Sequence, residues 1–383
     1  MYRYDEIRHV HIEPSTRCNA ACPMCPRNMN GATSPGLRLT DLSIEDIRRL
    51  LDAEFLGRLV GVDFCGAYGE PVLAPDILKI VEYVRRGGPA CRMVLYTNGG
   101  IHRPPWWTRL AQALGRPARV VFGIDGIGEV NGVYRRNVRF DQVIANARAF
   151  IEAGGEAQWD FLIFRHNEHQ IEQARAFSQE LGFVEFQPKK SGRFVRAAME
   201  YVPELDGAPD TDRFPIHSHR GQVIGLLEPP SDLALRNGSA VAVELLRHSA
   251  QGLDRMLDTT VIDCRVKGER SIYLGAQGYV FPCCQSYTAA TLPAVYGGNS
   301  PADRQMERLV LAHGGFDAIN ARIVGLRRAV ESELIAAVEH SWKRSSIADG
   351  RLKVCARVCG TELRTFEKQF ASAELVPGRT VRS

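Results

Sequence analysis

The stretch Val120-Val-Phe-Gly-Ile-Asp-Gly126 decides the fold that the sequence predicts. Its apolar first part is typical of a buried strand, and the Asp-Gly pair that ends it is typical of a turn. A helical spacing of apolar residues follows over 140–153, and another strand pattern follows over 158–164. A strand, a helix and a second strand in succession indicate a right-handed βαβ unit, and therefore an α/β fold with a parallel sheet.

The alternation of strands and helices continues on both sides of this unit. Further strands are predicted at 9–14, 60–65, 93–96 and 183–187, and further helices at 43–57, 75–86, 105–114 and 168–181. Six strand–helix repeats in succession curl into a barrel or part of one, and such folds place their chemistry where the strands end. The sequence therefore predicts a partial (β/α)6 TIM-like barrel.

The regular pattern stops after Pro188, and cysteines return at Cys264. We predict three regions: the barrel over 1–190, a connector over 191–257 with some helix at 240–257, and a small C-terminal α+β domain over 258–383. Within that last domain, a hairpin is predicted at 271–281 and helices over 303–340.

The composition is that of an ordinary globular protein, with 45% hydrophobic residues, 24% charged residues and a net charge of +4 over 383 residues. No run of more than two Lys or Arg residues points to nucleic acid, and no apolar run is long enough to span a membrane. The N-terminus has no apolar signal-peptide core, so we expect a cytoplasmic protein. Ten cysteines in a reducing compartment indicate metal binding or redox chemistry rather than disulfides.

Three of these cysteines form the compact motif Cys18-x3-Cys22-x2-Cys25, directly after the first predicted strand. Three thiolates on one loop suit an iron–sulfur cluster and leave a fourth iron without a protein ligand. Zinc is the alternative, but zinc prefers four ligands, and no fourth cysteine lies nearby in the sequence. The spacing alone therefore favours a cluster and leaves zinc open.

The position and spacing of this motif resemble the signature of the radical S-adenosylmethionine (radical SAM) superfamily, and Met24 fits the apolar position before its third cysteine. The resemblance covers residues 9–188. It implies a [4Fe–4S] cluster whose open iron is chelated by S-adenosylmethionine. It further implies reductive cleavage to a 5′-deoxyadenosyl radical, abstraction of a substrate hydrogen, and a flavodoxin or ferredoxin as electron donor.

The resemblance also assigns the residues at the ends of the predicted strands. Gly66-Ala-Tyr-Gly69-Glu70-Pro71 is one residue longer than the common Gly-x-Gly-Glu-Pro form, which would hold the amino group of S-adenosylmethionine. Thr97-Asn98-Gly99 and Asp125 resemble further cofactor-binding positions, with Asp125 near the ribose. After the fifth strand, Arg165 could meet a carboxylate and His166 could move protons. Plain turn chemistry is the alternative for each of these motifs taken singly.

The later cysteines resemble the auxiliary-cluster domains called SPASM and Twitch. Cys264-x13-Gly278-x4-Cys283 resembles the opening of such a domain, and Cys355-x3-Cys359 resembles a shortened close. Four cysteines suit one auxiliary [4Fe–4S] cluster, hence the shorter Twitch form, although a zinc site would use the same ligands. The adjacent Cys284 is an alternative to Cys283.

The resemblance implies several possible reactions. The first is two-electron oxidation of a small molecule such as a sugar or aminocyclitol, with the auxiliary cluster accepting an electron. The second is peptide modification by cross-linking or epimerisation, in which Cys65 would be either the hydrogen donor or a packed core thiol. The first strand begins near His9, so we expect no preceding peptide-recognition domain. A regulatory iron–sulfur or zinc protein without turnover is the alternative of another class.

Overall fold

The computed structural model describes residues 1–194, 213–247, 252–298 and 303–364. Its centre is a sheet of eight strands in the order β12-β11-β1-β4-β5-β6-β7-β8. Six of them follow the chain from one edge of the barrel to the other, all parallel: β1 (His9–Ile12), β4 (Gly61–Phe64), β5 (Arg92–Thr97), β6 (Ala118–Gly123), β7 (Ala157–Ile163) and β8 (Glu185–Lys190). The α/β class and the partial TIM-like barrel are therefore confirmed.

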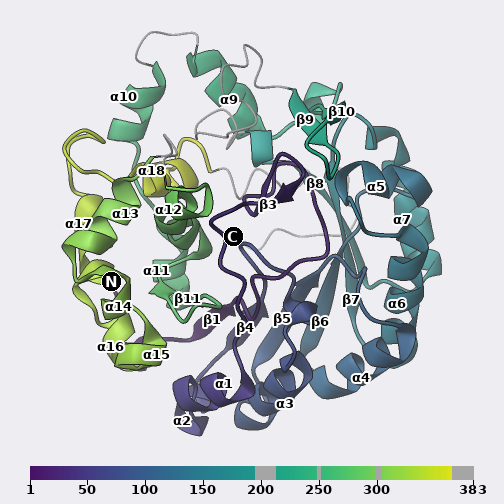
Figure 1. The fold of residues 1–383 in the computed structure, drawn as a ribbon, viewed down its shortest axis with the longest axis horizontal. Helices are drawn as coiled ribbons and strands as arrows, with labels where there is room; N and C mark the ends of the chain where they lie inside the picture. Colours follow the sequence, from purple (N-terminus) through teal and green to yellow (C-terminus); the bar gives the residue numbers. More distant parts are fainter. Residues whose placement is uncertain (195–212, 248–251, 299–302, 365–383) are drawn as a thin grey trace.

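Helices cover the outer face of this curved sheet, as Figure 1 shows. Their apolar sides pack on the strands around fully buried aromatic rings such as Trp107, Phe122 and Trp159. The covering helices are α1 (Ile44–Leu50), α2 (Ala53–Gly57), α3 (Ile77–Gly87), α4 (Pro104–Leu114), α5 (Asn131–Tyr134), α6 (Phe140–Glu152) and α7 (Ile171–Glu180). Helices on one face of a parallel sheet leave the carboxyl ends of the strands free for a site.

The single helix predicted over 43–57 is wrong, because the structure has two helices there. Ser43 caps α1 through a reciprocal pair of hydrogen bonds with Asp46. Asp52 then accepts a hydrogen bond from the Phe55 N–H and starts α2. Aspartate at this position competes for backbone donors, so it begins a new helix rather than continuing the old one.

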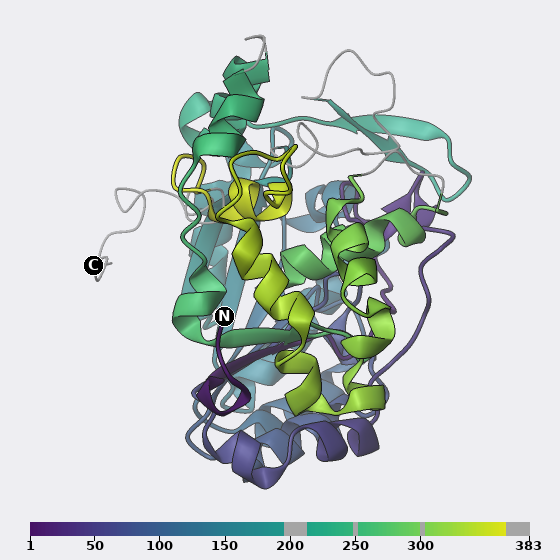
Figure 2. The same ribbon diagram turned by 90° about the vertical axis from the view of Figure 1, so that its left-hand side faces the viewer.

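The predicted C-terminal hairpin exists and extends the barrel sheet, which the sequence did not predict. Strand β11 (Ser271–Leu274) pairs in parallel with β1, and β12 (Val280–Phe281) pairs antiparallel with β11. The C-terminal region is thereby joined to the first barrel strand through backbone hydrogen bonds. Figure 2 shows its helices side by side with the first part of the chain.

Most of the C-terminal helices pack around an apolar core that includes Tyr68 from the barrel, whereas Ala321, Leu326 and Val330 of this region pack into the barrel core. The C-terminal helices are α11 (Arg265–Glu269), α12 (Cys284–Val295), α13 (Gln305–Ala312), α14 (Gly315–Ala318), α15 (Ala321–Val324), α16 (Leu326–Val330), α17 (Glu333–Ser341) and α18 (Lys353–Cys359). The helical pattern predicted over 303–340 is thus present as several short helices. The predicted domain boundaries remain predictions, and residues 299–302 and 365–383 of the last region lie outside the described residues.

The predicted connector contains more structure than its sequence indicated. Strands β9 (Phe214–His217) and β10 (Val223–Leu227) form an antiparallel hairpin, and helices α9 (Gly238–Arg247) and α10 (Gly252–Thr259) follow. Residues 195–212 and 248–251 of this region lie outside the described residues. Among the helices that the structure describes, none is long and apolar enough to cross a membrane.

Candidate functional site

A cavity of about 460 Å³ lies where the barrel strands end. The loop after β1 lines it with Cys18, Cys22 and Cys25, and the segment after β4 lines it from Cys65 to Glu70. The C-terminal helices α12 and α18 line the opposite side. This volume falls in the usual range for a small-molecule or cofactor site. The cavity is therefore shared between the barrel and the C-terminal region.

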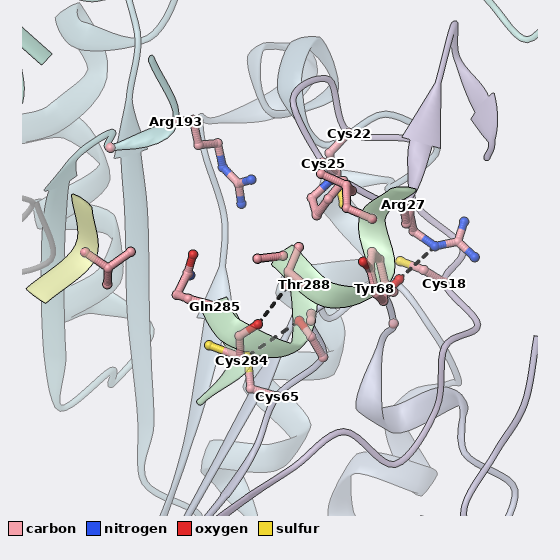
Figure 3. A pocket seen from close by; sticks show the side chains of 18 of the residues that line it. Cys18, Cys22, Cys25, Arg27, Cys65, Tyr68, Arg193, Cys284, Gln285 and Thr288 are labelled. Carbon is pink, nitrogen blue, oxygen red and sulfur yellow. Dashed lines mark hydrogen bonds between the residues drawn. The ribbon is translucent and has the colours of Figure 1, made fainter. Parts of the chain in front are cut away.

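The three cysteines of the first motif approach this cavity from one loop, as Figure 3 shows. Local hydrogen bonds shape the loop: the Cys25 N–H donates to the Cys22 carbonyl at 3.3 Å, and the Asn28 side chain donates to the same carbonyl at 3.1 Å. Met24 has a positive φ of 59°, which turns the chain tightly between the last two cysteines. Met24 therefore shapes the loop, and it is itself buried.

Burial controls the titration of Cys18 and Cys22. It raises the pKa of Cys18, and the nearby Glu70 carboxylate adds to that rise. It also raises the pKa of Cys22 to about 11, although the charge of Arg135 acts in the opposite direction. Thiolates in such an environment need a cation beside them, which a bound metal supplies. The donor set of three thiols on one loop therefore fits the iron–sulfur cluster that the family resemblance implies.

The turn after β4 lies against the cysteine loop with no space between the two backbones. A Cβ atom added at Gly66 would lie 2.1 Å from the Gly69 carbonyl oxygen, and one at Gly69 would lie 1.7 Å from the Ser15 carbonyl oxygen. Both positions therefore require glycine because of close approach rather than because of φ. The Glu70 N–H donates to the Arg17 carbonyl at 2.7 Å, which ties the turn to the loop.

The next turn, after β5, continues this network. The Glu70 carboxylate accepts a hydrogen bond from the Asn98 N–H at 2.8 Å, and burial raises the pKa of Glu70. The Asn98 side chain donates to Asn19 at 2.8 Å and points toward the Cys18 sulfur, 3.9 Å away. Thr97 accepts from the Gly99 N–H at 2.9 Å and does not itself line the cavity, but its side chain hydrogen-bonds Glu70. The structure thus brings Glu70 and Asn98 to the cavity and gives Thr97 a turn-forming contact.

Asp125 is fully buried and does not line the cavity. Its carboxylate accepts from the Arg135 guanidinium at 2.6 Å and from the Leu162 N–H at 2.7 Å. Arg135, in turn, lines the cavity. Asp125 therefore orients Arg135 through an ion pair, and its contact with a ribose hydroxyl stays a prediction.

Arg165 and His166 do not line the cavity. Arg165 is exposed and pairs with Glu228 at 3.4 Å. His166 stacks on Phe164, and burial lowers its pKa to about 4, so it is neutral at pH 7. The structure therefore supports neither the carboxylate-binding role predicted for Arg165 nor the proton transfer predicted for His166.

The cation that does reach this part of the cavity is Arg193, which was not predicted from the sequence. It follows β8, donates to the Met24 carbonyl at 3.2 Å and lies over the Tyr134 ring at 5.7 Å. Figure 3 shows its guanidinium group pointing into the cavity. Its position just after the end of the sixth strand was the available signal, since most of the other barrel residues that line the cavity also follow strand ends.

The second set of cysteines gathers beside the cavity. Cys264 precedes α11 and Cys283 precedes α12, each at the N-terminal end of its helix. Cys355 and Cys359 lie one turn apart on α18. Residues 261–263 pair with 359–361: the Asp263 N–H donates to the Cys359 carbonyl at 2.9 Å. This pairing brings the first and last of these cysteines together.

The pKa values of these thiols reflect their proximity. A hydrogen bond between the Cys264 and Cys359 side chains lowers the pKa of Cys359 to about 7 and raises that of Cys264. Burial raises the pKa of Cys355, and the charge of Cys283 adds to the rise. Four clustered thiols fit the donor set of a cluster or of zinc. Within the described part of the chain, no three Cys, His, Asp or Glu side chains converge closely enough for a single metal ion.

Cys284 faces a different direction from Cys283. It lines the cavity together with Cys65, and burial raises its pKa to about 12. The charge of Cys284 is the largest electrostatic influence on Cys65, so the two thiols are neighbours. Figure 3 shows them on the side of the cavity opposite Cys22 and Cys25. All ten cysteines of the chain are free thiols, so neither is held in a disulfide.

Parts of the chain are similar to known proteins in sequence or in fold. Residues 12–177 match the model of the Radical SAM superfamily. No curated protein matches the chain in sequence.

Solved structures of similar fold cover almost the whole chain. SuiB of Streptococcus suis bound to S-adenosylmethionine has a TM-score of 0.50 and 16% identity, covering 95% of this chain and 74% of that one. Native anSMEcpe with bound AdoMet and the Cp18Cys peptide has a TM-score of 0.51 and 15% identity, covering 96% of each chain. At these identities the likeness extends to the fold alone.

Proposed function

Residues 12–177 match the model of the Radical SAM superfamily, and on that premise we propose which residues hold the cofactors and what the reaction is. Cys18, Cys22 and Cys25 hold a [4Fe–4S] cluster, and the turns at Glu70 and Asn98 hold S-adenosylmethionine beside it. When bound, this pair supplies a 5′-deoxyadenosyl radical that abstracts a hydrogen atom from the substrate. The observation that carries the proposal is that all five residues line one cavity.

The residues of the chain orient and enclose the reacting groups. Residues 66–71 form the turn that we call the cofactor turn. The close contact of Gly69 with the Ser15 backbone holds this turn against the cysteine loop. Arg193 and Arg135 place positive charge at the cavity wall and suit a carboxylate of the cofactor or substrate. Helices α12 and α18 close the side opposite the cysteine loop. Such closure keeps water and stray groups away from reactive intermediates.

We further propose that the net reaction is a two-electron oxidation of a small molecule such as a sugar or aminocyclitol. Support comes from the second group, Cys264, Cys283, Cys355 and Cys359, which gathers beside the cavity and fits an auxiliary [4Fe–4S] cluster. Such a cluster could take the electron that a substrate radical must lose, while a proton goes to solvent, when its C–O bond becomes a double bond. A flavodoxin or ferredoxin would supply the first electron.

Iron and sulfide content, measured together with EPR, tests the two cysteine groups separately. The proteins are wild type and two variants reconstituted without oxygen, beside a Cys91→Ala control whose thiol is buried away from the cavity. The first variant replaces Cys18, Cys22 and Cys25 by alanine, and the second replaces Cys264, Cys283, Cys355 and Cys359. About eight irons in the wild type and the control, and about four in each variant, are expected for two clusters.

Other metal contents contradict the proposal. About four irons in the wild type, absent from the first variant, would remove the auxiliary cluster and the oxidation that depends on it. Zinc in place of iron in both groups would leave a regulatory zinc protein as the better interpretation. Iron in both groups without cleavage of S-adenosylmethionine would favour a regulatory iron–sulfur protein.

Epimerisation is the second candidate, and the free thiols of Cys65 and Cys284 in the cavity favour it. A carbon radical that takes a hydrogen atom from a thiol becomes a C–H group and leaves a sulfur radical. One electron and one proton from the donor protein and solvent return that sulfur to the thiol. A peptide substrate belongs to this candidate, since one structure of similar fold contains a bound peptide.

Deuterium labelling separates the two candidates without a known substrate. The loaded protein cleaves S-adenosylmethionine alone in D2O, in buffer free of added thiols. A thiol close to the cofactor has exchanged to S–D and would transfer deuterium to 5′-deoxyadenosine. The second candidate predicts a label that Cys284→Ala or Cys65→Ala lowers and Cys91→Ala does not. Unlabelled 5′-deoxyadenosine from the wild type rejects these thiols as donors.

A further inference from the structure

The buried carboxylate of Glu13 connects the cofactor turn to the C-terminal region. Glu13 follows β1 and is fully buried. One carboxylate oxygen accepts from the N–H groups of Tyr68 at 2.7 Å and Gly69 at 3.1 Å. The other oxygen accepts from the Tyr273 hydroxyl on β11 at 2.6 Å. One side chain thus receives donors from both the barrel turn and the C-terminal hairpin.

Tyr68 connects the same two parts of the protein. It lies in the six-residue turn that is one residue longer than the common form of the motif. Its carbonyl accepts from the Arg27 guanidinium at 2.8 Å, and its hydroxyl bonds Thr291 on α12 at 2.8 Å. Its ring packs edge-on against Tyr287 at a centroid distance of 5.6 Å. The longer turn therefore carries a side chain that is buried in the C-terminal core.

These contacts leave the backbone of the turn with little freedom. The Tyr68 and Gly69 N–H groups both donate to Glu13. Unpaired buried N–H groups are costly, so without Glu13 the turn would rearrange to reach another acceptor. Glu70, the next residue, lines the cavity, so any such rearrangement moves the cofactor side of the turn.

We propose that Glu13 is a positioning residue that makes binding of S-adenosylmethionine depend on the docked C-terminal hairpin, through Tyr273 on one carboxylate oxygen and the Tyr68–Gly69 backbone on the other. The cofactor part of this inference rests on the proposed function. The positioning of the turn itself does not, because its contacts lie within the protein. The C-terminal region would then influence cofactor binding through the backbone of the turn, in addition to lining the cavity with α12 and α18.

The charge state of Glu13 supports a pH-dependent form of this coupling. Burial raises its pKa to about 7, although the hydrogen bonds from Tyr273, Tyr68, Gly69 and Tyr287 act to lower it. The other titratable groups that face it are the thiols of Cys65 and Cys284. Above about pH 7 the carboxylate accepts all of these hydrogen bonds. Below about pH 7, a proton on one Glu13 oxygen displaces one of the hydrogen-bond donors, so the turn that contains Tyr68 and Gly69 loosens.

Hydrogen exchange on the protein without S-adenosylmethionine tests the positioning role. The variants are Glu13→Gln and Tyr273→Phe. The control is Tyr279→Phe on the same hairpin, whose ring packs on Phe316 at 5.1 Å, away from Glu13. The amides of residues 66–70 are expected to exchange about tenfold faster in both variants and unchanged in the control, because a hydrogen bond to a charged group is lost or weakened. Unchanged exchange in both variants overturns the inference.

Cofactor affinity across pH 6 to 8.5 provides the second readout, measured by equilibrium binding of S-adenosylmethionine to reconstituted protein. We expect wild-type affinity to fall as the pH drops through about 7 and Glu13→Gln to be weaker and flat across this range. A pH dependence that survives in Glu13→Gln contradicts the inference. If the wild type binds no S-adenosylmethionine at all, the proposed function fails, while faster exchange in the variants still supports the positioning of the turn.

Discussion

Replacing Gly69 by alanine is a sharp test of how the cofactor turn and the cysteine loop fit together. The new Cβ atom would lie 1.7 Å from the Ser15 carbonyl oxygen and 2.9 Å from the Thr16 Cα. Both contacts are with backbone, so no side chain can rotate away. Ordinary contact begins near 3.4 Å, so the two segments must separate by about 1.7 Å.

The expected losses of stability and of activity follow from that displacement. Overpacking of a tight contact costs about 1–3 kcal/mol of folding free energy. The larger effect falls on the reaction, because a shift of roughly 1 Å at a reacting centre can lower the rate about a hundredfold. The displaced loop carries Cys18, Cys22 and Cys25, so cluster loading should also fall. We therefore expect a modest loss of stability and a large loss of S-adenosylmethionine cleavage.

The assays are thermal unfolding, iron content and 5′-deoxyadenosine formation under dithionite. Gly132→Ala is the matched control, since a Cβ atom there meets nothing within 4 Å and the position lies in helix α5. The control should behave like the wild type in all three assays. Full iron content and full cleavage activity in Gly69→Ala would refute the claim that this contact sets the site.

Three further predictions follow from buried charges and thiols. Asp125→Asn should destabilise the fold by about 3–5 kcal/mol in chemical denaturation, because Arg135 is left with an unpaired buried charge; Asp5→Asn, at an exposed pair, should change nothing measurable. Adding Arg135→Met to Asp125→Asn should recover part of that loss, and no recovery would mean that the ion pair is not its source. The raised pKa of Glu13 means that the folded state binds its proton more tightly than the unfolded state. This contribution therefore favours folding below about pH 4.5 and is lost as the pH rises through about 7. The free energy of unfolding should change by about 3 kcal/mol across this range. Denaturation curves of the apoprotein should show this change in the wild type and not in Glu13→Gln. Cys355→Ala should lower the iron content of reconstituted protein by up to about four atoms and leave 5′-deoxyadenosine formation in place; loss of both would place Cys355 at the first cluster instead.

The parts of the fold that sequence could predict are those with local periodicity. The six barrel strands and their helices repeat apolar residues with a regular spacing, so the α/β barrel could be predicted from the chain alone. The break at Asp52 was missed because a helix cap inside an apolar pattern resembles an ordinary polar face. The pairing of β11 with β1 was missed because its partner lies far away in sequence, and no local pattern specifies it.

The candidate site likewise has parts that the sequence could predict and parts that it could not. The cysteine loop and the turns at Glu70 and Asn98, which line one cavity, could be singled out in the sequence because they form short motifs at strand ends. The orientation of a side chain depends instead on its packing partners, so Asp125 turned toward Arg135 and His166 stacked on Phe164. For the same reason, sequence could not distinguish Cys283 from Cys284, which face different groups of thiols. Glu13 carries no motif, and only the fold brings its hydrogen-bond donors together.

Formation of 5′-deoxyadenosine from S-adenosylmethionine tests most directly whether this protein is a radical SAM enzyme. The measurement uses protein reconstituted without oxygen, dithionite as reductant, and the variant in which Cys18, Cys22 and Cys25 are replaced by alanine. We predict 5′-deoxyadenosine and methionine in equal amounts from the wild type and none from the variant. No 5′-deoxyadenosine from fully iron-loaded wild type, or equal amounts from both proteins, would contradict the assignment.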